Sequence, residues 1–162
     1  KKWEPLYKQM NKLANDSQKL KYELIQLIDS DTDSFKMVME AYKLPNNSKE
    51  QIKDRNAAID QSLKEATNVP FRTLQFCRKI MDLSLEAVKY GNSNSISDAG
   101  VSGEMASAGA RSAALNVCIN LKDINDVHFS KKVEKDTEII LNEVSDLLSQ
   151  IRKTVNYKLD NE

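Results

Sequence analysis

The sequence predicts an all-α fold, an antiparallel bundle of about five long helices, and three observations favour it. Glycine and proline are scarce, with 4 and 3 residues in a chain of 162, well below the usual usage of about 7% and 5%. Apolar residues recur at alternating steps of four and three, which is the spacing of one helical face. No segment alternates with the period of two that a half-buried strand shows, so no sheet is expected.

The first expected helix runs from about Leu6 to Lys43, as one helix or as two nearly collinear ones. Pro45 disfavours helical backbone at Leu44, so the helix should end there. The apolar stripe of this helix consists of Leu6, Met10, Leu13, Leu20, Leu24 and Leu27, followed by Ile28, Asp31, Phe35, Val38 and Tyr42.

The next two expected helices are separated by a proline. Ser48 and Gln51 form a candidate capping box, so the second helix begins at Ser48 and ends near Asn68. Pro70 suits the first turn of the third helix, and Gly91 suits a left-handed cap at its end. The stripes are Ile52, Ile59, Leu63 and Ala66 in the second helix, and Leu74, Cys77, Met81, Leu85 and Val88 in the third.

The fourth expected helix is rich in small residues and should therefore be central. Ser97 or Asp98 is placed to cap its start, and small residues such as Gly103 and Ala110 would let a neighbouring backbone approach closely. Its expected apolar face is Val101, Met105, Ala108, Leu115 and Ile119.

After a turn through residues 125–126, the last helix has the stripe Val133, Ile140, Val144, Leu147, Ile151 and Val155. The first and last helices are long enough to bury their seams against another subunit, so a homodimer or larger oligomer is expected.

Composition argues against several classes of protein. The 24 basic and 24 acidic residues leave a net charge of zero, so nothing favours nucleic acid or an anionic membrane surface as a partner. No apolar run approaches the roughly 18 residues of a membrane span, and residues 1–10 lack the apolar stretch of a signal peptide. The chain begins with Lys1 rather than a start methionine, so it is expected to be a piece of something longer.

Motifs for metals and common cofactors are missing as well. Cys77 and Cys118 form no CxxC pair, which argues against a zinc module or a disulfide framework and fits a reducing cytoplasm. Both cysteines are expected to be small core hydrophobes. Phosphate-loop, dinucleotide-binding, zinc-protease and serine-hydrolase motifs are absent from the sequence. His128 is the one histidine, and a surface or capping role is expected for it.

One aspartate is the leading candidate for chemistry. Asp31 lies one turn after Leu27 and one turn before Phe35, inside the apolar stripe, whereas Asp29 and Asp33 lie about 200° away around the helix. A carboxylate forced toward the core has a raised pKa, which suits general acid or base work near neutral pH. A helix cap or a buried amide that satisfies the carboxylate is the structural alternative.

Polar side chains at two other places could contact a ligand. Asn116 and Asn120 are one turn apart and could hold the edge of a heteroaromatic ring, or simply tie a neighbouring helix or loop. The polar loop 92–98 precedes a helix start, a place that can receive an anionic or carbonyl group. Loops of this composition are more often only turns.

Several segments together resemble a known enzyme family. They are Leu27 to Asp31 with Phe35, Ala41 to Pro45, Ala66 to Pro70, Gly91 to Val101 and Asn116 to Leu121. In this order and spacing, the chain resembles the formimidoyltetrahydrofolate cyclodeaminase and methenyltetrahydrofolate cyclohydrolase family, which includes the cyclodeaminase half of formiminotransferase-cyclodeaminase. The segments GNSNSISDAGV and NVCINL are the most specific.

The resemblance implies an all-helical, dimeric, cytoplasmic folate enzyme with no metal and no tightly bound cofactor. The expected reaction cyclises 5-formimidoyltetrahydrofolate to 5,10-methenyltetrahydrofolate and releases ammonia, as in histidine degradation. A glutamate formiminotransferase is a candidate partner. Methenyltetrahydrofolate cyclohydrolase activity is the enzymatic alternative, and a non-catalytic helical interaction module of the same fold is the alternative from another class.

The resemblance also implies roles for particular residues. Asp31 matches the second aspartate of the I-D-x-D motif of the family, and it is the expected catalytic residue. The residues expected to line or support the folate pocket are Asn92, Asn94, Ser95, Asp98, Asn116 and Asn120. The family has a glycine-rich helix upstream, so residues 1–162 are expected to form a single cyclodeaminase-like domain that lacks this helix. Lys1 and Lys2 would meet the glutamate tail of folate, or are simply solvated.

Overall fold

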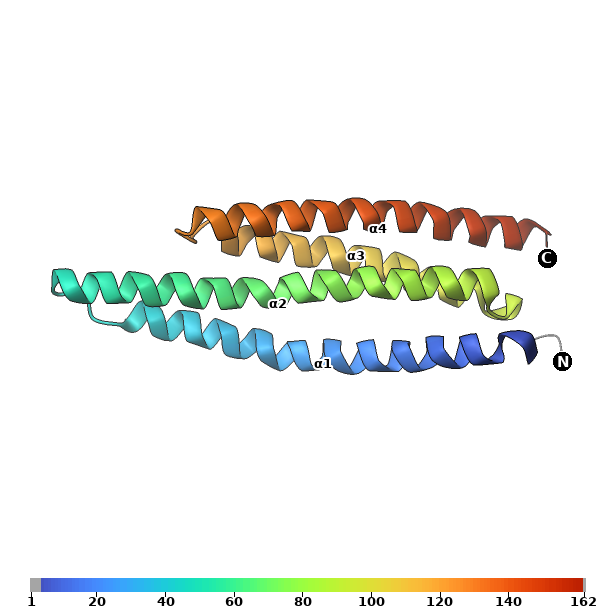
Figure 1. Cartoon of the computed structure of the whole chain (residues 1–162), viewed down its shortest axis with the longest axis horizontal. Helices are drawn as coiled ribbons and strands as arrows, with labels where there is room; N and C mark the ends of the chain where they lie inside the picture. Colours follow the sequence, from blue (N-terminus) through green and yellow to red (C-terminus); the bar gives the residue numbers. More distant parts are fainter. Residues whose placement is uncertain (1–3, 162) are drawn as a thin grey trace.

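The computed structural model describes residues 4–161, and four long helices form an antiparallel bundle (Figure 1). These helices are α1 (Tyr7–Lys43), α2 (Lys49–Tyr90), α3 (Ile96–Leu121) and α4 (Val127–Asn161), and the short 3-10 helices η1 (Glu4–Leu6) and η2 (Ser93–Ser95) precede α1 and α3. Residues 4–161 contain no strand, and the all-α prediction is confirmed. The prediction for Lys1 and Lys2 lies outside the described residues.

The two ends of the described chain lie at the same end of the bundle (Figure 1). The turn between α2 and α3 is also at this end, whereas the loop between α1 and α2 and the turn between α3 and α4 are at the other. None of the four helices is both long enough and apolar enough to cross a membrane.

Four long helices are present rather than about five because α2 runs without a break through Pro70. The expected helix boundary at residues 68–70 is therefore wrong. The proline ring fixes φ near its helical value, but it crowds the carbonyl of Ala66 and removes the hydrogen bond that a backbone N–H would have made to it. Since α2 packs against all three other long helices, its burial offsets that loss.

The main core lies between α2, α3 and α4. Leu74 and Met81 of α2 and Val144 and Ile151 of α4 are almost fully enclosed, which confirms the expected stripes of α4 and of the second half of α2. In the first half of α2, Leu63 is buried as expected, but Ile52 is 45% exposed. The packed face of α3 consists largely of glycine, alanine and serine. A β-carbon added to Gly103 would lie 2.8 Å from Ile151 Cδ1, so a small residue is needed there. The expected close approach of a neighbouring helix to these small residues is confirmed, but the expectation that this helix is central is wrong, because α2 and not α3 packs against all three other long helices.

The large apolar side chains of α3 point away from this core, which corrects the expected face. Val101, Met105, Leu115 and Ile119 are between 56% and 72% exposed. They lie on the side of α3 opposite the glycine and alanine face. Only the small side chains let α3 approach α2 and α4 closely. The face with the small residues is therefore buried, and the large residues are exposed to solvent.

The buried stripe of α1 is confirmed in its first half and shifted in its second. From Leu20 onward it follows a strict seven-residue repeat through Leu27, Ser34 and Ala41, as expected for a helix that coils around a neighbour. Of the residues expected in the second half of the stripe, Val38 is buried, whereas Ile28, Asp31, Phe35 and Tyr42 are exposed.

Two expected helix caps are only partly correct. Ser48 Oγ accepts a hydrogen bond from the backbone N–H of Gln51 at 3.2 Å, but Gln51 Oε1 accepts from the N–H of Asn47 rather than from that of Ser48. The capping box is therefore half formed. Gly91 ends α2 in extended backbone, with φ −73° and ψ −179°, so the predicted left-handed cap is wrong.

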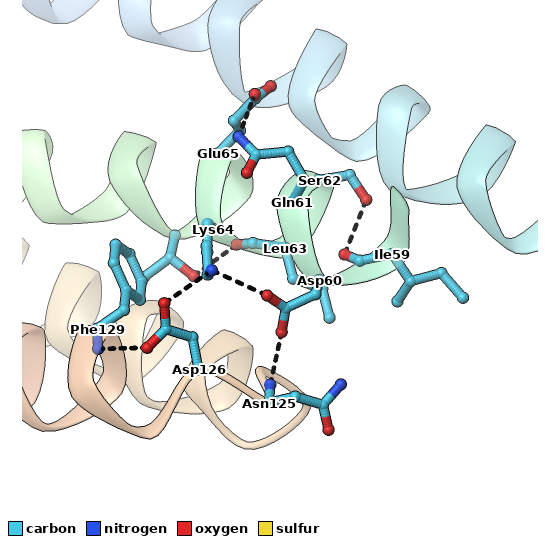
Figure 2. A network of polar contacts seen from close by, with 11 residues as sticks. Ile59, Asp60, Gln61, Ser62, Leu63, Lys64, Glu65, Asn125, Asp126 and Phe129 are labelled. Carbon is cyan, nitrogen blue, oxygen red and sulfur yellow. Dashed lines mark hydrogen bonds and ion pairs between the residues drawn. The ribbon is translucent and has the colours of Figure 1, made fainter. Parts of the chain in front are cut away.

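A polar network joins α2 to the start of α4 (Figure 2). Lys64 Nζ lies 2.9 Å from both Asp60 Oδ2 and Asp126 Oδ2. Asp60 Oδ1 accepts a hydrogen bond from the N–H of Asn125, and Asp126 Oδ1 accepts one from the N–H of Phe129. Burial acts to raise the pKa of Asp60, but hydrogen bonds from Lys64 and Asn125 outweigh it and hold that pKa below its usual value. Hydrogen bonds from Phe129 and Lys64 lower the pKa of Asp126.

We expect this network to make the stability of the protein sensitive to acid. Because both carboxyl pKa values are lowered on folding, the contribution is fully present above the unfolded pKa, about 3.9, and is lost as pH falls through the folded values. The variant Lys64→Met should have a lower Tm at pH 7 and a smaller loss of Tm between pH 7 and pH 3 than the wild type. Thermal unfolding followed by circular dichroism measures both, with the exposed Lys53→Met as control. An unchanged acid sensitivity in Lys64→Met would contradict this role.

Candidate functional site

A groove runs between α1 and α3, with α2 as its floor. It consists of two adjoining clefts of about 500 Å³ and 480 Å³, which share Asp31, Thr32, Pro70 and Asn116. The apolar residues that line it are Leu24, Leu27, Ile28, Phe35, Val38, Leu63, Ala66, Val69, Ala113 and Ile119. We call these two clefts the α1–α3 groove. The polar residues that line it are Asp31, Thr32, Ser34, Thr73, Ser112, Asn116 and Asn120, so the groove combines apolar walls with polar groups, as small-molecule sites do.

Asp31 lies where the two clefts meet, but it is exposed. The expectation that the bundle buries this carboxylate is wrong. The buried repeat of α1 passes through Leu27 and Ser34, and Asp31 lies between them at the edge that borders the groove. Within residues 4–161 no hydrogen bond or ion pair holds the Asp31 carboxylate, so the cap or amide of the structural alternative is not found. The carboxylate is therefore available to a molecule in the groove.

Two asparagines of α3 share the groove with Asp31. Asn116 lines both clefts and is exposed, and Asn120 lines one of them. The structure thus brings Asp31, Asn116 and Asn120 together, although α1 and α3 are far apart in the sequence.

Asn120 also satisfies a backbone group of the neighbouring helix. Its Nδ2 donates a hydrogen bond to the carbonyl of Ala66 at 3.2 Å. That carbonyl is the one that the missing N–H of Pro70 leaves without its helical partner. This contact is the structural role proposed as the alternative for Asn120, and it fixes the floor of the groove against α3.

We expect Asn120→Ala to lower the free energy of unfolding by about 1 to 3 kcal/mol, the range for leaving a buried polar group unpaired. In a Pro70→Ala background the restored N–H can bond the carbonyl of Ala66, so the same substitution should cost less there. Urea unfolding of the wild type, both single variants and the double variant forms a double-mutant cycle. Additive effects would show that Asn120 and Pro70 are not coupled through this carbonyl.

The remaining predicted site residues lie elsewhere in the single chain. Asn92, Asn94, Ser95 and Asp98 belong to the α2–α3 turn or to the first turn of α3, and none lines either cleft. Asn92 Oδ1 accepts a hydrogen bond from the N–H of Asn94 at 3.1 Å, which caps η2. Asp98 precedes Asn116 by eighteen residues on α3, which corresponds to about 27 Å. The single chain therefore does not bring this turn to Asp31.

Two further expectations are wrong, one on the cap of α3 and one on the burial of Cys118. Helix α3 already begins at Ile96, so Ser97 and Asp98 lie within it and do not cap it. Cys77 is buried as expected, and burial raises the pKa of its thiol. Cys118 is exposed, so its prediction as a core residue is wrong.

Groove residues that the sequence did not indicate are Thr32, Pro70 and Thr73. The hydroxyls of Thr32 and Thr73 donate to the carbonyls of Ile28 and Val69 within their own helices, which is a common habit of helical threonine and gives no sequence signal. Of these three residues, only Pro70 gives a signal that the sequence analysis could have used. A proline inside a helix leaves the carbonyl four residues before it without its N–H donor, so another helix must supply a donor at that place.

Two other features of the described chain bear on its chemistry. His128 is exposed in the first turn of α4, which confirms the surface role expected for it. Among residues 4–161, no three His, Cys, Asp or Glu side chains are grouped as metal ligands would be.

The chain is similar in sequence to proteins of one family and similar in fold to a solved structure. Residues 1–139 match the family described as Formiminotransferase-cyclodeaminase. The chain is 38% identical over 160 residues to a methenyltetrahydrofolate cyclohydrolase of Methylorubrum extorquens, covering 99% of this chain and 77% of that protein. It is 31% identical over 121 residues to a formimidoyltransferase-cyclodeaminase of Mus musculus, covering 75% of this chain but only 22% of that longer protein. The crystal structure of a formiminotetrahydrofolate cyclodeaminase from Thermotoga maritima has the same fold, with a TM-score of 0.87 and 23% identity over 98% of this chain and 75% of that one.

Proposed function

The chain belongs to the formiminotransferase-cyclodeaminase family, and from this premise we propose that it is a folate one-carbon enzyme that forms or opens the 5,10-methenyl bridge of tetrahydrofolate. One observation carries the proposal: the unpaired carboxylate of Asp31 lies where the two clefts of the α1–α3 groove meet, together with Asn116. A flat pterin suits apolar walls with a few polar groups that fix its orientation.

The cyclodeaminase reaction needs two proton transfers at adjacent nitrogens. N10 of 5-formimidoyltetrahydrofolate attacks the carbon of the protonated formimidoyl group and loses its proton. The nitrogen of that group, which already carries two hydrogens, gains this third proton before it leaves as ammonia, so that the positive charge stays on the methenyl product. In this proposal Asp31 accepts the first proton and supplies the second, as a general base and then a general acid. The amide of Asn116 holds the folate so that N10 and the carbon stay within reaction distance.

Cyclohydrolase activity is the second candidate, and one observation favours it. The relative that is similar over 99% of the chain is a methenyltetrahydrofolate cyclohydrolase. In that reaction water adds to the methenyl carbon and releases one proton. The hydroxyl that it leaves there then loses its proton to become the formyl carbonyl, and N5 takes up a proton as its bond to the carbon breaks, which gives 10-formyltetrahydrofolate. The same carboxylate serves both reactions, because both make or break a carbon to nitrogen bond at one bridge.

Absorbance of the methenyl chromophore distinguishes the two reactions. Formation of the chromophore from 5-formimidoyltetrahydrofolate, with ammonia released in equal amount, is the result expected of a cyclodeaminase. Decay of 5,10-methenyltetrahydrofolate faster than in buffer alone identifies a cyclohydrolase. If neither occurs, and calorimetry detects no folate binding, the chain is a non-catalytic helical module and the proposal is wrong.

We also propose the domain organisation, oligomeric state and cellular location of the enzyme. In this proposal residues 1–162 form one cyclodeaminase-like domain, which acts as a homodimer. Two free cysteines, Cys77 and Cys118, suit a reducing compartment, and the cytoplasm is the proposed location. A glutamate formiminotransferase in histidine degradation is the proposed source of the formimidoyl group for the cyclodeaminase reaction.

A further inference from the structure

A third cleft continues the α1–α3 groove toward the start of α1 and the start of α3. It has a volume of about 440 Å³, and it shares Leu24 with one of the two clefts at Asp31. The same three helices line it, since Lys21 of α1, Ser84 of α2 and Ser102 of α3 all contribute to its walls. We call this third cleft the Lys21 cleft.

The two ends of this extended groove carry opposite charges. Among the described residues that line the three clefts, Asp31 is the only acidic residue and Lys21 is the only basic one. Lys21 Nζ donates a hydrogen bond to Gln18 Oε1 and lies 4.9 Å from the centre of the Tyr22 ring, and within residues 4–161 no carboxylate pairs with it. An ammonium group has three N–H donors, so Lys21 retains donors and its full charge for a ligand.

The hydrogen-bonding groups change along the groove in the same direction. Around Asp31, four lining hydroxyls donate their hydrogens to carbonyls of their own helices, so only their oxygens are open to a ligand. These hydroxyls belong to Thr32, Ser34, Thr73 and Ser112. In the Lys21 cleft, Ser84 Oγ donates to Ser102 Oγ at 2.9 Å, and within residues 4–161 the hydroxyl of Ser102 has no acceptor of its own. The Asp31 end therefore mainly accepts hydrogen bonds, whereas Lys21 and Ser102 can donate them.

We propose that the Lys21 cleft is the subsite for the anionic glutamate tail of a folate whose one-carbon bridge lies at Asp31. This inference rests on the proposed function. A folate has its groups in the matching order, with N–H donors on the pterin and a positive charge on the methenyl bridge, a flat aminobenzoyl ring in the middle, and carboxylates at the far end. Leu24 and Ile25 lie between the two charged residues and offer apolar surface to the ring.

The spacing of the two charges suits this orientation of the substrate. Asp31 and Lys21 are ten residues apart on α1, which corresponds to about 15 Å along the helix. Aminobenzoylglutamate is roughly as long as three residues of extended chain, or about 10 Å, and the flexible stem of the Lys21 side chain can cover the remainder. The pterin then extends the other way from Asp31, toward Asn116 and Asn120.

Binding of an unreactive folate tests the subsite without turnover. Tetrahydrofolate carries no one-carbon unit, and its dimethyl ester keeps the length of the tail but loses the charges. Calorimetry should show that the wild type binds tetrahydrofolate about 3- to 30-fold more tightly than the ester, the range for one hydrogen-bonded ion pair at a partly open site. Lys21→Met should bind the two compounds equally, with helicity preserved in circular dichroism.

Lys19→Met is the matched control, because Lys19 is also an exposed lysine of α1 but lines none of the three clefts. It should keep the preference of the wild type for the charged tail. A wild type that binds tetrahydrofolate no better than the ester, or a Lys21→Met variant that keeps the preference, overturns the proposal.

Steady-state kinetics separates a binding role of Lys21 from a chemical one. Since Lys21 would contact only the tail, far from the reacting bridge, Lys21→Met should raise KM by about the same factor of 3 to 30 and leave kcat unchanged. Lys21→Arg keeps a positive charge and should recover most of the wild-type KM. A fall in kcat with an unchanged KM would place Lys21 in the chemistry and overturn the tail subsite.

The two kinds of measurement also separate this inference from the proposed function. Tetrahydrofolate binding that depends on Lys21, without turnover of either one-carbon folate, would refute the proposed function and leave the tail subsite established. Turnover of one of these folates with the same KM in the wild type and in Lys21→Met would support the function and refute the subsite.

Discussion

Replacing Asp31 with asparagine should lower folate turnover by about 100- to 10 000-fold, the range for loss of a general acid or base. Asparagine has nearly the same shape as aspartate but cannot take up or release the proton. No hydrogen bond or ion pair within residues 4–161 depends on this carboxylate, so helicity and Tm should not change. The rate is measured from the methenyl chromophore at saturating substrate, for whichever of the two reactions the wild type performs.

Asp29→Asn is the matched control, because Asp29 is also an exposed aspartate of α1 but lines neither cleft. It should keep wild-type turnover. Asp31→Glu retains a carboxyl group at a displaced position and should be more active than Asp31→Asn. Equal losses in the Asp29 and Asp31 variants, or no loss in Asp31→Asn, would remove Asp31 from the mechanism.

Replacing Met81 with alanine should lower the free energy of unfolding by about 2 to 5 kcal/mol. Met81 of α2 is fully enclosed in the core shared by α2, α3 and α4, and its loss would leave a cavity between helices that already pack closely. Met39→Ala, at a position that is 44% exposed, should change the same quantity by less than about 0.5 kcal/mol. Urea unfolding followed by circular dichroism measures both. Similar effects at the two positions would mean that this core is not packed as described.

The helices with a single apolar face could be predicted from the sequence. The stripes of α4 and of the second half of α2 are buried as expected, since only one face of each is apolar and only that face can be removed from water. Helix α3 is different, because small residues occupy one face and large apolar residues the other. Periodicity alone does not decide which face packs, and the choice depends on how closely α2 and α4 approach.

The continuity of α2 could not be predicted, because it depends on a residue fifty positions away. An interior proline normally signals a boundary, but Asn120 supplies a donor to the carbonyl of Ala66 and the helix continues. The exposure of Asp31 has a similar origin. Spacing placed it in the apolar stripe, but whether that side of α1 is covered depends on which helix lies beside it.

The sequence predicted two groups of site residues, Asp31 with the asparagines of α3 and the residues of the α2–α3 turn. In the single chain these two groups lie apart. Asp31, Asn116 and Asn120 do meet in one groove, which the order of the motifs in the sequence did not reveal. The residues of the α2–α3 turn were indicated by the polar composition of the loop 92–98 and by the family resemblance. Their distance from the groove is set by the length of α3, which periodicity does not relate to the position of Asp31 on α1.

The arrangement of the two chain ends determines where another protein can be attached. Residues 4 and 161 lie at the same end of the bundle as the α2–α3 turn (Figure 1), so a fluorescent reporter or affinity tag fused at either terminus would crowd that turn. The exposed loop around Asn46, at the opposite end, is the better insertion point. A tag placed there would leave the turn and the groove open to titration with substrate.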